Sequence, residues 1–285
     1  MTALADYFGS IPSAHRALIL VGGITFFWVL ESAVPLFRFD YRKWRHALVN
    51  LFFTATTVVV NFGLAFTLLL ASEWAVGNRF GVLFLAPGLP LVVQALIGLL
   101  LLDLISAWFA HWVQHKTPLL WKLHLIHHSD THVDTTSANR HHPGESVIRF
   151  LFTSLATVLV GAPLWMVFLY QALSVVLSQF NHANISLPRA VDRVLSWVIV
   201  SPDMHKVHHH YVLPYTDSNY GNIFSAWDRL FGTFQTLDRA QLVYGIDTHR
   251  DPAEHGDVRA LLTMPFRPKP SARSWESRPA AGASP

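Results

Sequence analysis

The sequence predicts an all-α integral membrane protein with about four membrane-spanning helices plus a helical hairpin, and with a histidine-rich cap at one end. The composition indicates a membrane, because 52% of the residues are hydrophobic and 14% are charged, whereas a soluble domain carries about 25% charged residues. The chain also contains 17 histidines, most of them between His111 and His210. Histidines that only decorate a surface would be spread more evenly, so this clustering indicates a dedicated site.

The chain has no cysteine, which excludes disulfides, thiolate zinc sites and cysteine-ligated iron–sulfur clusters within this polypeptide. Any electrons that its chemistry uses must therefore come from elsewhere. The formal net charge of +3 is small, and the basic residues cluster beside apolar segments and toward the C-terminus. We interpret them as signals for orientation in the membrane, and we expect no nucleic-acid partner.

Three apolar runs ahead of the histidines are each long enough to cross the hydrocarbon core, which takes about 20 residues. They are residues 17–37, 47–71 and 91–110. Four basic residues lie between Arg38 and Arg45, whereas the loop after the second run has Arg79 as its one basic residue. Because basic residues favour the cytosolic side, the first loop is predicted to be cytosolic. The third run then returns the chain to the cytosol at His111.

The next apolar run, residues 147–180, is too long for one crossing and is interrupted by Gly161 and Pro163. Two topologies are open. A single crossing would leave His182 on the far side from His111, so that the histidine motifs could never meet. A hairpin that enters the membrane and returns delivers His182 to the same side, and the sequence favours the hairpin for that reason.

Three histidine motifs, one HxxxH and two HxxHH, carry the chemistry. Their histidines are His111 and His115; His124, His127 and His128; and His205, His208 and His209. Residues three and four apart on a helix share a face, so each motif is expected to project its rings together. Eight rings exceed what one ion can use, which predicts two metal ions, and imidazoles without thiolates suit iron, zinc, copper or nickel. Solvated interfacial histidines are the alternative, and the recurrence of the pattern argues against it.

The chain resembles the fatty acid hydroxylase/sterol desaturase superfamily of membrane di-metal oxygenases. The resemblance extends over residues 103–234 and rests on the order of these motifs. It also rests on the stretches WKLHLIHHSDTHVDTTSANRHHPGE, SQFNHANI and DSNYGNIFSAWDRLFGTF. The resemblance implies a cytosolic, histidine-rich di-metal cap on a four-helix membrane unit. It also implies two iron ions as cofactor, O2 as oxidant, and a lipid chain or sterol as substrate.

The resemblance further implies a ligand set. It assigns metal binding to the eight motif histidines and to the isolated His182, while Ser178 stands where some members have another histidine. We expect His142 to fill the tenth position. The predicted metal ligands are therefore His111, His115, His124, His127, His128, His142, His182, His205, His208 and His209.

Two carboxylates are the candidate catalytic residues. Asp103 lies inside the third apolar run, where a carboxylate is costly enough to need a partner. It would hydrogen-bond a ligating histidine or serve helix packing. Glu145 would bind metal or handle protons, or it would cap the first helix of the hairpin.

Two further groups are predicted to support the site. An apolar throat, through which a lipid would enter from the bilayer, is expected from Trp108, Phe109, Leu177 and Phe180. A polar brace under the metals is expected from Asp217, Asn219, Asn222 and Asp228.

The sequence predicts membrane helices over residues 1–90, a catalytic domain over 91–240 and a polar, partly disordered tail over 241–285. The predicted function is O2-dependent, di-iron hydroxylation or desaturation of an unactivated C–H bond in a membrane lipid, fatty acyl chain or sterol-like substrate. A separate donor, a reductase with a ferredoxin or a cytochrome b5-like protein, would supply electrons. The alternatives are a zinc-dependent membrane hydrolase, although HWVQH lacks the glutamate of HExxH, and a non-catalytic metal-binding membrane protein.

Overall fold

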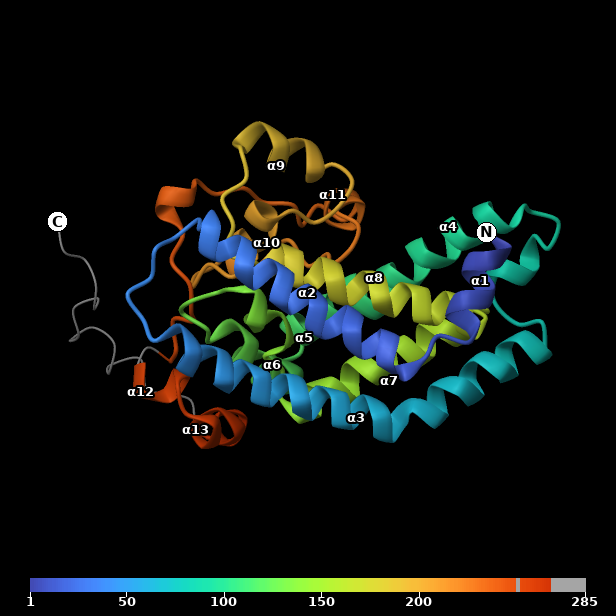
Figure 1. Ribbon diagram of the computed structural model, residues 1–285, viewed down its shortest axis with the longest axis horizontal. Coiled ribbons are helices and arrows are strands. Elements are labelled where there is room, and N and C mark those ends of the chain that lie inside the picture. Colours follow the sequence, from blue (N-terminus) through green and yellow to red (C-terminus); the bar gives the residue numbers. More distant parts are fainter. Residues whose placement is uncertain (250–251, 268–285) are drawn as a thin grey trace.

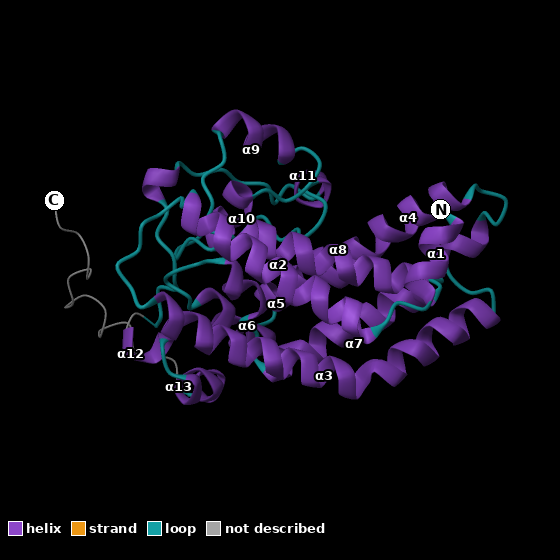
Figure 2. Cartoon of the chain, viewed as in Figure 1, coloured by secondary structure: helices purple, strands orange, loops and turns teal. Residues whose placement is uncertain are grey.

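Every regular element of the described chain is a helix (Figure 2). The structure is a computed structural model that describes residues 1–249 and 252–267. Within these residues no strand forms, and isolated β-bridges link neighbouring loops. The all-α prediction is confirmed.

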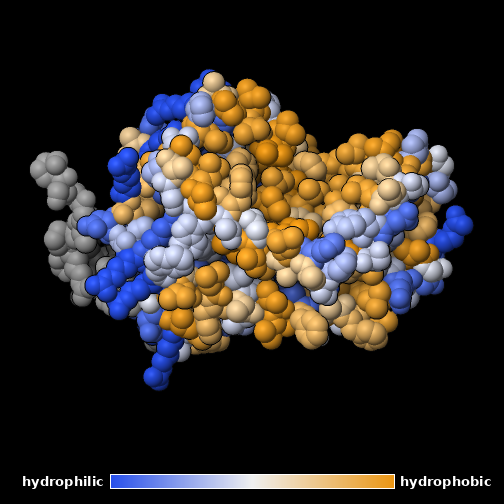
Figure 3. Space-filling view, in the orientation of Figure 1, coloured by the Kyte–Doolittle hydropathy of each residue, from blue (hydrophilic) through white to orange (hydrophobic). Residues whose placement is uncertain are grey.

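Five helical stretches of the described residues are long and apolar enough to cross a membrane. They are Ser13–Ala33, Lys43–Leu85, Leu91–Lys116, Pro143–Val160 and Leu164–His182. They extend along the long axis of the molecule (Figure 1). Apolar side chains cover much of the surface between the two ends in Figure 3, and hydrophilic ones lie toward both ends, most of them at the left. The chain is therefore a multi-pass membrane protein.

The first two spans follow the predicted apolar runs. The short α1 (Thr2–Gly9) precedes α2 (Ser13–Ala33). The second span, α3 (Lys43–Gly77), has 35 residues, more than the hydrocarbon core requires. A 3-10 turn, η1 (Val82–Leu85), then leads toward the third span.

The third span is composite. It consists of α4 (Leu91–Asp103), a π-helical segment η2 (Leu104–Phe109) and α5 (Ala110–Lys116). A π-helical segment inside a helix is frequent at functional sites. This one ends just before His111.

The predicted hairpin consists of α7 (Pro143–Val160) and α8 (Leu164–His182). Gly161 ends α7 with φ of +73°, a left-handed conformation that glycine adopts without strain. A Cβ there would lie 2.5 Å from the carbonyl oxygen of Phe80. The return of α8 brings His182 Nε2 to 3.2 Å from His127 Nε2, so the hairpin prediction is confirmed.

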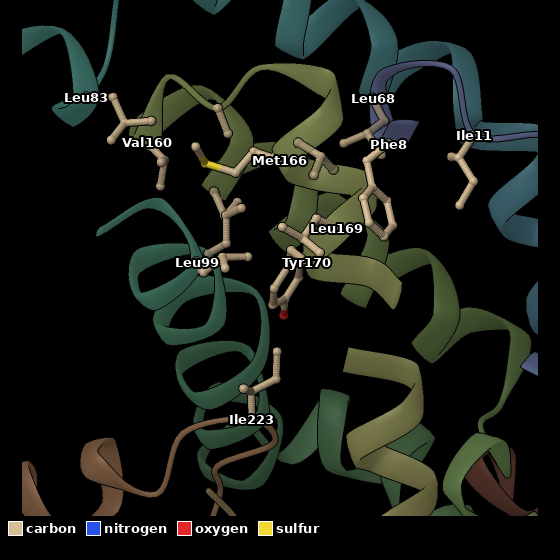
Figure 4. Close-up of a cluster of buried hydrophobic side chains, with 14 of the residues drawn as sticks. Phe8, Ile11, Leu68, Leu83, Leu99, Val160, Met166, Leu169, Tyr170 and Ile223 are labelled. Carbon is tan, nitrogen blue, oxygen red and sulfur yellow. The ribbon is translucent and has the colours of Figure 1, made fainter. Parts of the chain in front are cut away.

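Close approach of helices holds the bundle together. Because lipid is as apolar as a leucine side chain, contacts between membrane helices depend on fit more than on the removal of water. A Cβ at Gly98 of α4 would lie 2.1 Å from Met166 Sδ of α8, so glycine permits the approach of these two helices. Met166 belongs to a buried apolar cluster from α1, α4, α7 and α8 (Figure 4).

The remaining helices of residues 117–241 build a cap at one end of the bundle. They are α6 (Pro118–His128), η3 (Thr135–Asn139), α9 (Arg189–Leu195), α10 (Pro202–His208), η4 (Tyr215–Asp217), α11 (Ala226–Leu230) and η5 (Arg239–Gln241). A proline occupies the first turn of both α6 and α10, where its fixed φ is already helical and its missing N–H costs nothing. The two short helices that carry the HxxHH motifs thus have defined starting points.

Residues 252–267 fold back onto the cap as α12 (Pro252–His255), α13 (Val258–Thr263) and η6 (Met264–Phe266). Leu261 and Met264 are buried there with Phe53 of α3 and residues of α6. Residues 252–267 of the region predicted as a polar tail are therefore folded, whereas residues 250–251 and 268–285 lie outside the described residues. The predicted domain boundaries stay predictions.

A buried polar network joins α3 to the cap. His46 Nε2 lies 2.8 Å from Asp130 Oδ1, although sequence analysis assigned this histidine no role. Arg140, with 0% exposure, donates to Asn50 Oδ1 at 3.0 Å and to the carbonyl of Ile126 at 3.0 Å. Breaking a buried charge pair costs about 3–5 kcal/mol, so this network fixes the segment between α6 and α7 firmly against α3.

Candidate metal centre

Nine histidines of the described chain converge in two groups. The five-histidine cluster contains His111, His115, His124, His128 and His208, and the four-histidine cluster contains His127, His182, His205 and His209. Within each cluster, one ligand atom from every residue lies within 4.8 Å of the others. Nine of the ten predicted ligands are thus brought together, and His142 is the exception.

The five-histidine cluster gathers Nε2 atoms at one point. His124 Nε2 lies 3.0 Å from His111 Nε2 and 3.2 Å from His128 Nε2. The outer nitrogens are anchored, since His111 Nδ1 donates to the Tyr220 carbonyl at 2.9 Å and His208 Nδ1 donates to the Ser218 carbonyl at 2.6 Å. A carbonyl oxygen can only accept, so each of these rings carries its proton on Nδ1 and presents a bare Nε2.

The four-histidine cluster is arranged around His182. Its Nε2 lies 3.2 Å from His127 Nε2, 3.0 Å from His205 Nε2 and 3.2 Å from His209 Nε2. His182 Nδ1 donates to the Ser178 carbonyl at 2.7 Å. The Nδ1 atoms of the other three rings are buried without a hydrogen-bond partner among the described residues.

Each HxxHH motif divides between the two clusters, which differs from the expectation that a motif projects its rings together. His124 and His128 join one cluster and His127 joins the other. In the second motif, His205 and His209 stay together while His208 crosses over. The reason is helical geometry, because successive residues are about 100° apart and only the i, i+4 pair is nearly aligned. Two motifs therefore supply ligands to both clusters and link them.

Burial sets the protonation of the rings that lie outside the membrane spans. It lowers the pKa of His127, His205 and His209 well below the usual range, and neighbouring histidines lower it further. Burial also lowers the pKa of His208 to about 4. These imidazoles are thus neutral at neutral pH, the form that binds a metal.

The convergence fits bound cations. An Nε2 atom carries at most one proton, so four Nε2 atoms around one point cannot all satisfy one another by hydrogen bonds. His115 Nε2 and His208 Nε2 in the other cluster are buried without a partner among the described residues. A metal ion in each cluster would satisfy these atoms. Two sites made of imidazoles alone fit iron, zinc, copper or nickel.

The two candidate catalytic carboxylates have different surroundings. Glu145 is fully buried and its Oε1 accepts from His124 Nδ1 at 2.8 Å, the arrangement that orients a metal-binding ring. Asp103 makes no hydrogen bond to a histidine among the described residues. It accepts from the backbone N–H of Ile223 at 3.2 Å and of Phe224 at 3.1 Å, so it positions a loop of the cap. The two roles predicted for Asp103 stay predictions.

His142 is expected to be the tenth metal ligand, but it lies outside both clusters. Its ring nitrogen accepts from the Gly144 N–H at 3.0 Å and thereby caps α7, because Pro143 starts the helix and leaves the residue before it as the cap. The neighbouring His141 lies beside the four-histidine cluster. It is buried, and its ring centre is 4.9 Å from that of His127.

The predicted polar brace is present in the segment 217–233. Asp228 accepts from the Tyr220 and Gly221 N–H groups at 2.8 and 2.9 Å and from Trp108 Nε1 at 3.0 Å. A Cβ on Gly221 would lie 2.9 Å from Asp228 Oδ2, so glycine allows this tight turn. The brace holds the carbonyl of Tyr220 in place beneath His111.

A small cavity of about 20 Å³ lies against five of the clustered histidines, enough for about one water-sized molecule. Apart from histidines, it is lined by Ala107, Ala138, Arg149, Ser178, Tyr220, Gly221 and Asn222. The four residues predicted to form an apolar throat are not among them. Trp108 stacks on Phe231 at 4.4 Å, and Phe180 packs against Phe27 at 5.8 Å, so these rings are used for packing.

Sequence reasoning missed Arg149, although a signal was present. This arginine lies within the apolar run 147–180, and an ionisable residue in a membrane span is by default a candidate for function. It assigned His141 to the surroundings of the site or to the surface, and it missed Arg140; the positions of both depend on how the segment between α6 and α7 folds. Their residue types alone gave no signal.

Comparison with known proteins agrees with this site. Residues 95–233 match the family model described as fatty acid hydroxylase. The ornithine lipid hydroxylase of Rhizobium tropici is 27% identical over 150 residues, which are 53% of this chain and 44% of that protein. A cholesterol 25-hydroxylase-like protein of Danio rerio is 30% identical over 149 residues, 52% of this chain and 58% of that protein. The alkylglycerol monooxygenase of Xenopus tropicalis is 29% identical over 152 residues, 50% of this chain and 30% of that protein.

The matches thus span less than two thirds of the length of each of these relatives. No solved structure matches the chain. The segment that matches the family model contains all nine clustered histidines. Over this segment the chain is similar to the fatty acid hydroxylase family and to lipid hydroxylases and monooxygenases, in agreement with the resemblance to the fatty acid hydroxylase/sterol desaturase superfamily that its motifs indicate.

Proposed function

We propose that this chain is a membrane-bound, O2-dependent di-iron oxidoreductase that hydroxylates an unactivated C–H bond of a lipid. The observation that carries the proposal is the pair of buried all-histidine clusters at one end of a bundle of membrane helices. Such sites suit redox-active iron, and they lie at the end of apolar membrane helices, where a lipid substrate is at hand. The relatives are named as hydroxylases or a monooxygenase, which favours insertion of oxygen over desaturation.

The proposed reaction balances with an external donor of electrons. One atom of O2 enters the C–H bond to give an alcohol, and the other leaves as water after two electrons and two protons are added. Bound iron would supply the redox chemistry for O2. The two electrons would come from a separate reductase with a ferredoxin or a cytochrome b5-like protein.

The chain's own residues hold and shield the site. Glu145 orients the ring of His124, and the brace orients His111 through the carbonyl of Tyr220. The cavity beside the clusters has room for about one small molecule of the size of water or O2. The surrounding helices keep bulk water away, which protects a reactive site from side reactions.

Expression in a host of defined lipid composition under 18O2 tests the proposal, with untargeted lipid analysis and metal analysis of the purified protein. We expect about two irons per chain and a lipid that contains one 18O atom. This labelled lipid should be absent from a host that expresses the His128→Ala variant. One zinc per chain with a hydrolysis product would instead support the hydrolase. Two metals with unchanged lipids would support non-catalytic metal binding.

We also place the cap in the cytosol. The basic loop of residues 38–45 belongs to the cap end, because Tyr41 donates to Asp134 Oδ2 at 3.0 Å. Basic loops favour the cytosolic side of a membrane. The metals would therefore lie where cytosolic electron donors can reach the protein.

Accessibility tags test this orientation. Tags near Thr131 and near Asp217 should both report the cytosol, whereas a tag near Asn78 should report the opposite face. Reversal of all three reports would overturn the orientation alone. Opposite reports from Thr131 and Asp217 would contradict a shared cap.

A further inference from the structure

The cavity beside the metal clusters has one cationic wall. Arg149 lines it from α7, opposite Ser178 of α8 and Ala107 of η2. Apart from the clustered His111 and His182, the membrane helices contribute Arg149 and the small residues Ala107 and Ser178 to the lining, so Arg149 is the one cationic side chain that they bring to the cavity. A molecule that approaches the histidines from the bundle would therefore meet Arg149.

The position of Arg149 on α7 makes its positive charge energetically unfavourable. Residues four apart share a helix face, so Arg149 lies on the face of the fully buried Glu145. The opposite face carries Leu151 and Leu155, which are 54% and 46% exposed and suit contact with lipid. A cation on the inward side of a membrane helix is expensive without a partner. It also stands beside two clusters built to hold further positive charge.

The protein itself supplies a weak partner for this cation. Glu145 Oε1 lies 3.8 Å from Arg149 Nη1, beyond hydrogen-bond distance, and the same oxygen already accepts from His124. Arg140 donates two hydrogen bonds of 3.0 Å from its guanidinium. Within residues 1–249 and 252–267 the guanidinium of Arg149 makes no such hydrogen bond. The Arg149 side chain remains 29% exposed, so its donors are open to a ligand.

We propose that Arg149 binds an anionic oxygen group, a carboxylate or a phosphate, on the lipid substrate. The planar guanidinium presents paired N–H donors that match such groups in a bidentate way. Ser178 and Asn222 give the same cavity a polar lining, which fits a polar headgroup better than a hydrocarbon chain. This inference rests on the proposed function, because it names the class of substrate for that same site.

The geometry also restricts where the substrate is oxidised. Arg149 shares a cavity of about 20 Å³ with His111, His124 and His182. The cavity itself has room for about one water-sized molecule, so an anionic group held by Arg149 would lie at its edge, and the oxidised carbon would be only a few bonds away from that group. The apolar remainder of the lipid points away from the site. A carbon deep in an acyl chain would have to pass the cation to react, and is therefore not the target.

Three probes with one hydrocarbon chain test this inference. They are oleate, monooleyl phosphate and oleyl alcohol, which differ only in the charge and geometry of the head. Native mass spectrometry of the metal-loaded protein reports bound probe and bound metal in one measurement. We expect at least one anionic probe to bind about tenfold more tightly than the alcohol, a difference of about 1.4 kcal/mol. The preferred anion distinguishes a carboxylate-bearing substrate from a phosphate-bearing one.

Variants separate recognition from structure. Arg149→Gln should remove the preference for the anionic probe and leave affinity for the alcohol within about twofold, with both metals bound. Arg149→Lys keeps the charge without the paired donors and should retain part of the preference. Arg45→Gln, an exposed arginine of α3, should change nothing. Equal binding of the three probes by the unmodified protein, or a preference that survives in Arg149→Gln, would overturn the inference.

The outcome is independent of turnover. A protein that prefers the anionic probe but oxidises no lipid would support the binding role of Arg149 and contradict the proposed function. A protein that incorporates 18O and binds all three probes equally would support the proposed function and contradict the binding role of Arg149. The two proposals therefore fail on different measurements.

Discussion

The two histidine clusters differ in how firmly the protein holds their rings. In the five-histidine cluster, His111, His124 and His208 each donate from Nδ1 to a backbone or carboxylate oxygen. In the four-histidine cluster, His182 alone among the described residues does so. Histidines that bind metal usually donate their outer N–H to such a partner, which fixes the ring and raises its basicity.

This difference indicates that the two clusters bind metal with different affinity and adapt to different degrees. The five-histidine cluster has three of its five rings oriented before any metal arrives, so it should bind metal more tightly and with less rearrangement than the four-histidine cluster. The four-histidine cluster has one ligand fewer and three rings whose outer nitrogens have no partner, so it should bind metal more weakly and change its coordination more readily. We expect the second cluster to be the one that adapts when substrate enters.

The largest expected effect comes from two adjacent residues. His127→Ala and His128→Ala should each reduce bound metal from two ions to about one and lower activity at least about 100-fold, more than loss of an outer partner costs. The ion that remains should differ, because the two residues belong to different clusters. X-ray absorption should count about five histidines around it in His127→Ala and about four in His128→Ala.

Replacement of the exposed His15 by alanine is the control and should leave metal and activity unchanged. Identical spectra from the two cluster variants would show that the two groups act as one site. That outcome would remove the comparison between the clusters altogether.

A smaller effect is expected from Glu145→Gln. The amide oxygen still accepts from His124 but carries no charge, so the ring becomes a weaker ligand. Metal affinity of the five-histidine cluster should fall about 10- to 100-fold, whereas the four-histidine cluster should keep its affinity. Isothermal titration of the metal-free protein measures both. Glu73→Gln, on an exposed residue of α3, should alter neither, and equal weakening of both clusters would contradict a role confined to His124.

A chelator should empty the two clusters at concentrations that differ about tenfold. This estimate follows from the effect that the outer hydrogen-bond partners of the histidines have on metal affinity. The four-histidine cluster should empty first, because three of its rings lack an outer anchor. Iron released per chain would then appear in two steps, with X-ray absorption showing about five histidines around the ion that remains. A single step, or first loss from the five-histidine cluster, would reverse the proposed order.

Sequence reasoning reached the spans, the hairpin and the gathering of nine histidines, because these follow from apolar length and from motif spacing. It did not divide the motifs correctly between clusters. That division depends on how α5, α6, α8 and α10 meet, and no spacing within one motif encodes it. Nor could it find the carbonyls of Ser218 and Tyr220 as anchors, since every residue has a carbonyl. The buried Asp130 and Arg140 network is likewise set by tertiary contacts.

The smallest effect is expected from Asp103→Asn, which tests how the brace serves the better-anchored cluster. The carboxylate accepts from the N–H groups of Ile223 and Phe224 and from Trp227 Nε1 at 3.1–3.2 Å. An asparagine of the same shape would turn an NH2 group toward one of these donors and leave it buried without an acceptor, which costs about 1–3 kcal/mol. Thermal unfolding should therefore begin at a lower temperature.

Both metals should remain bound in Asp103→Asn, because Asp103 touches no ligand. Any loosening should reach the five-histidine cluster first, since the loop held by Asp103 continues into Tyr220 beneath His111. Metal titration after mild heating measures this order. Earlier loss from the four-histidine cluster would show that the loop supports both sites equally, and the contrast between a fixed and an adaptable cluster would then rest on the side-chain anchor Glu145 alone.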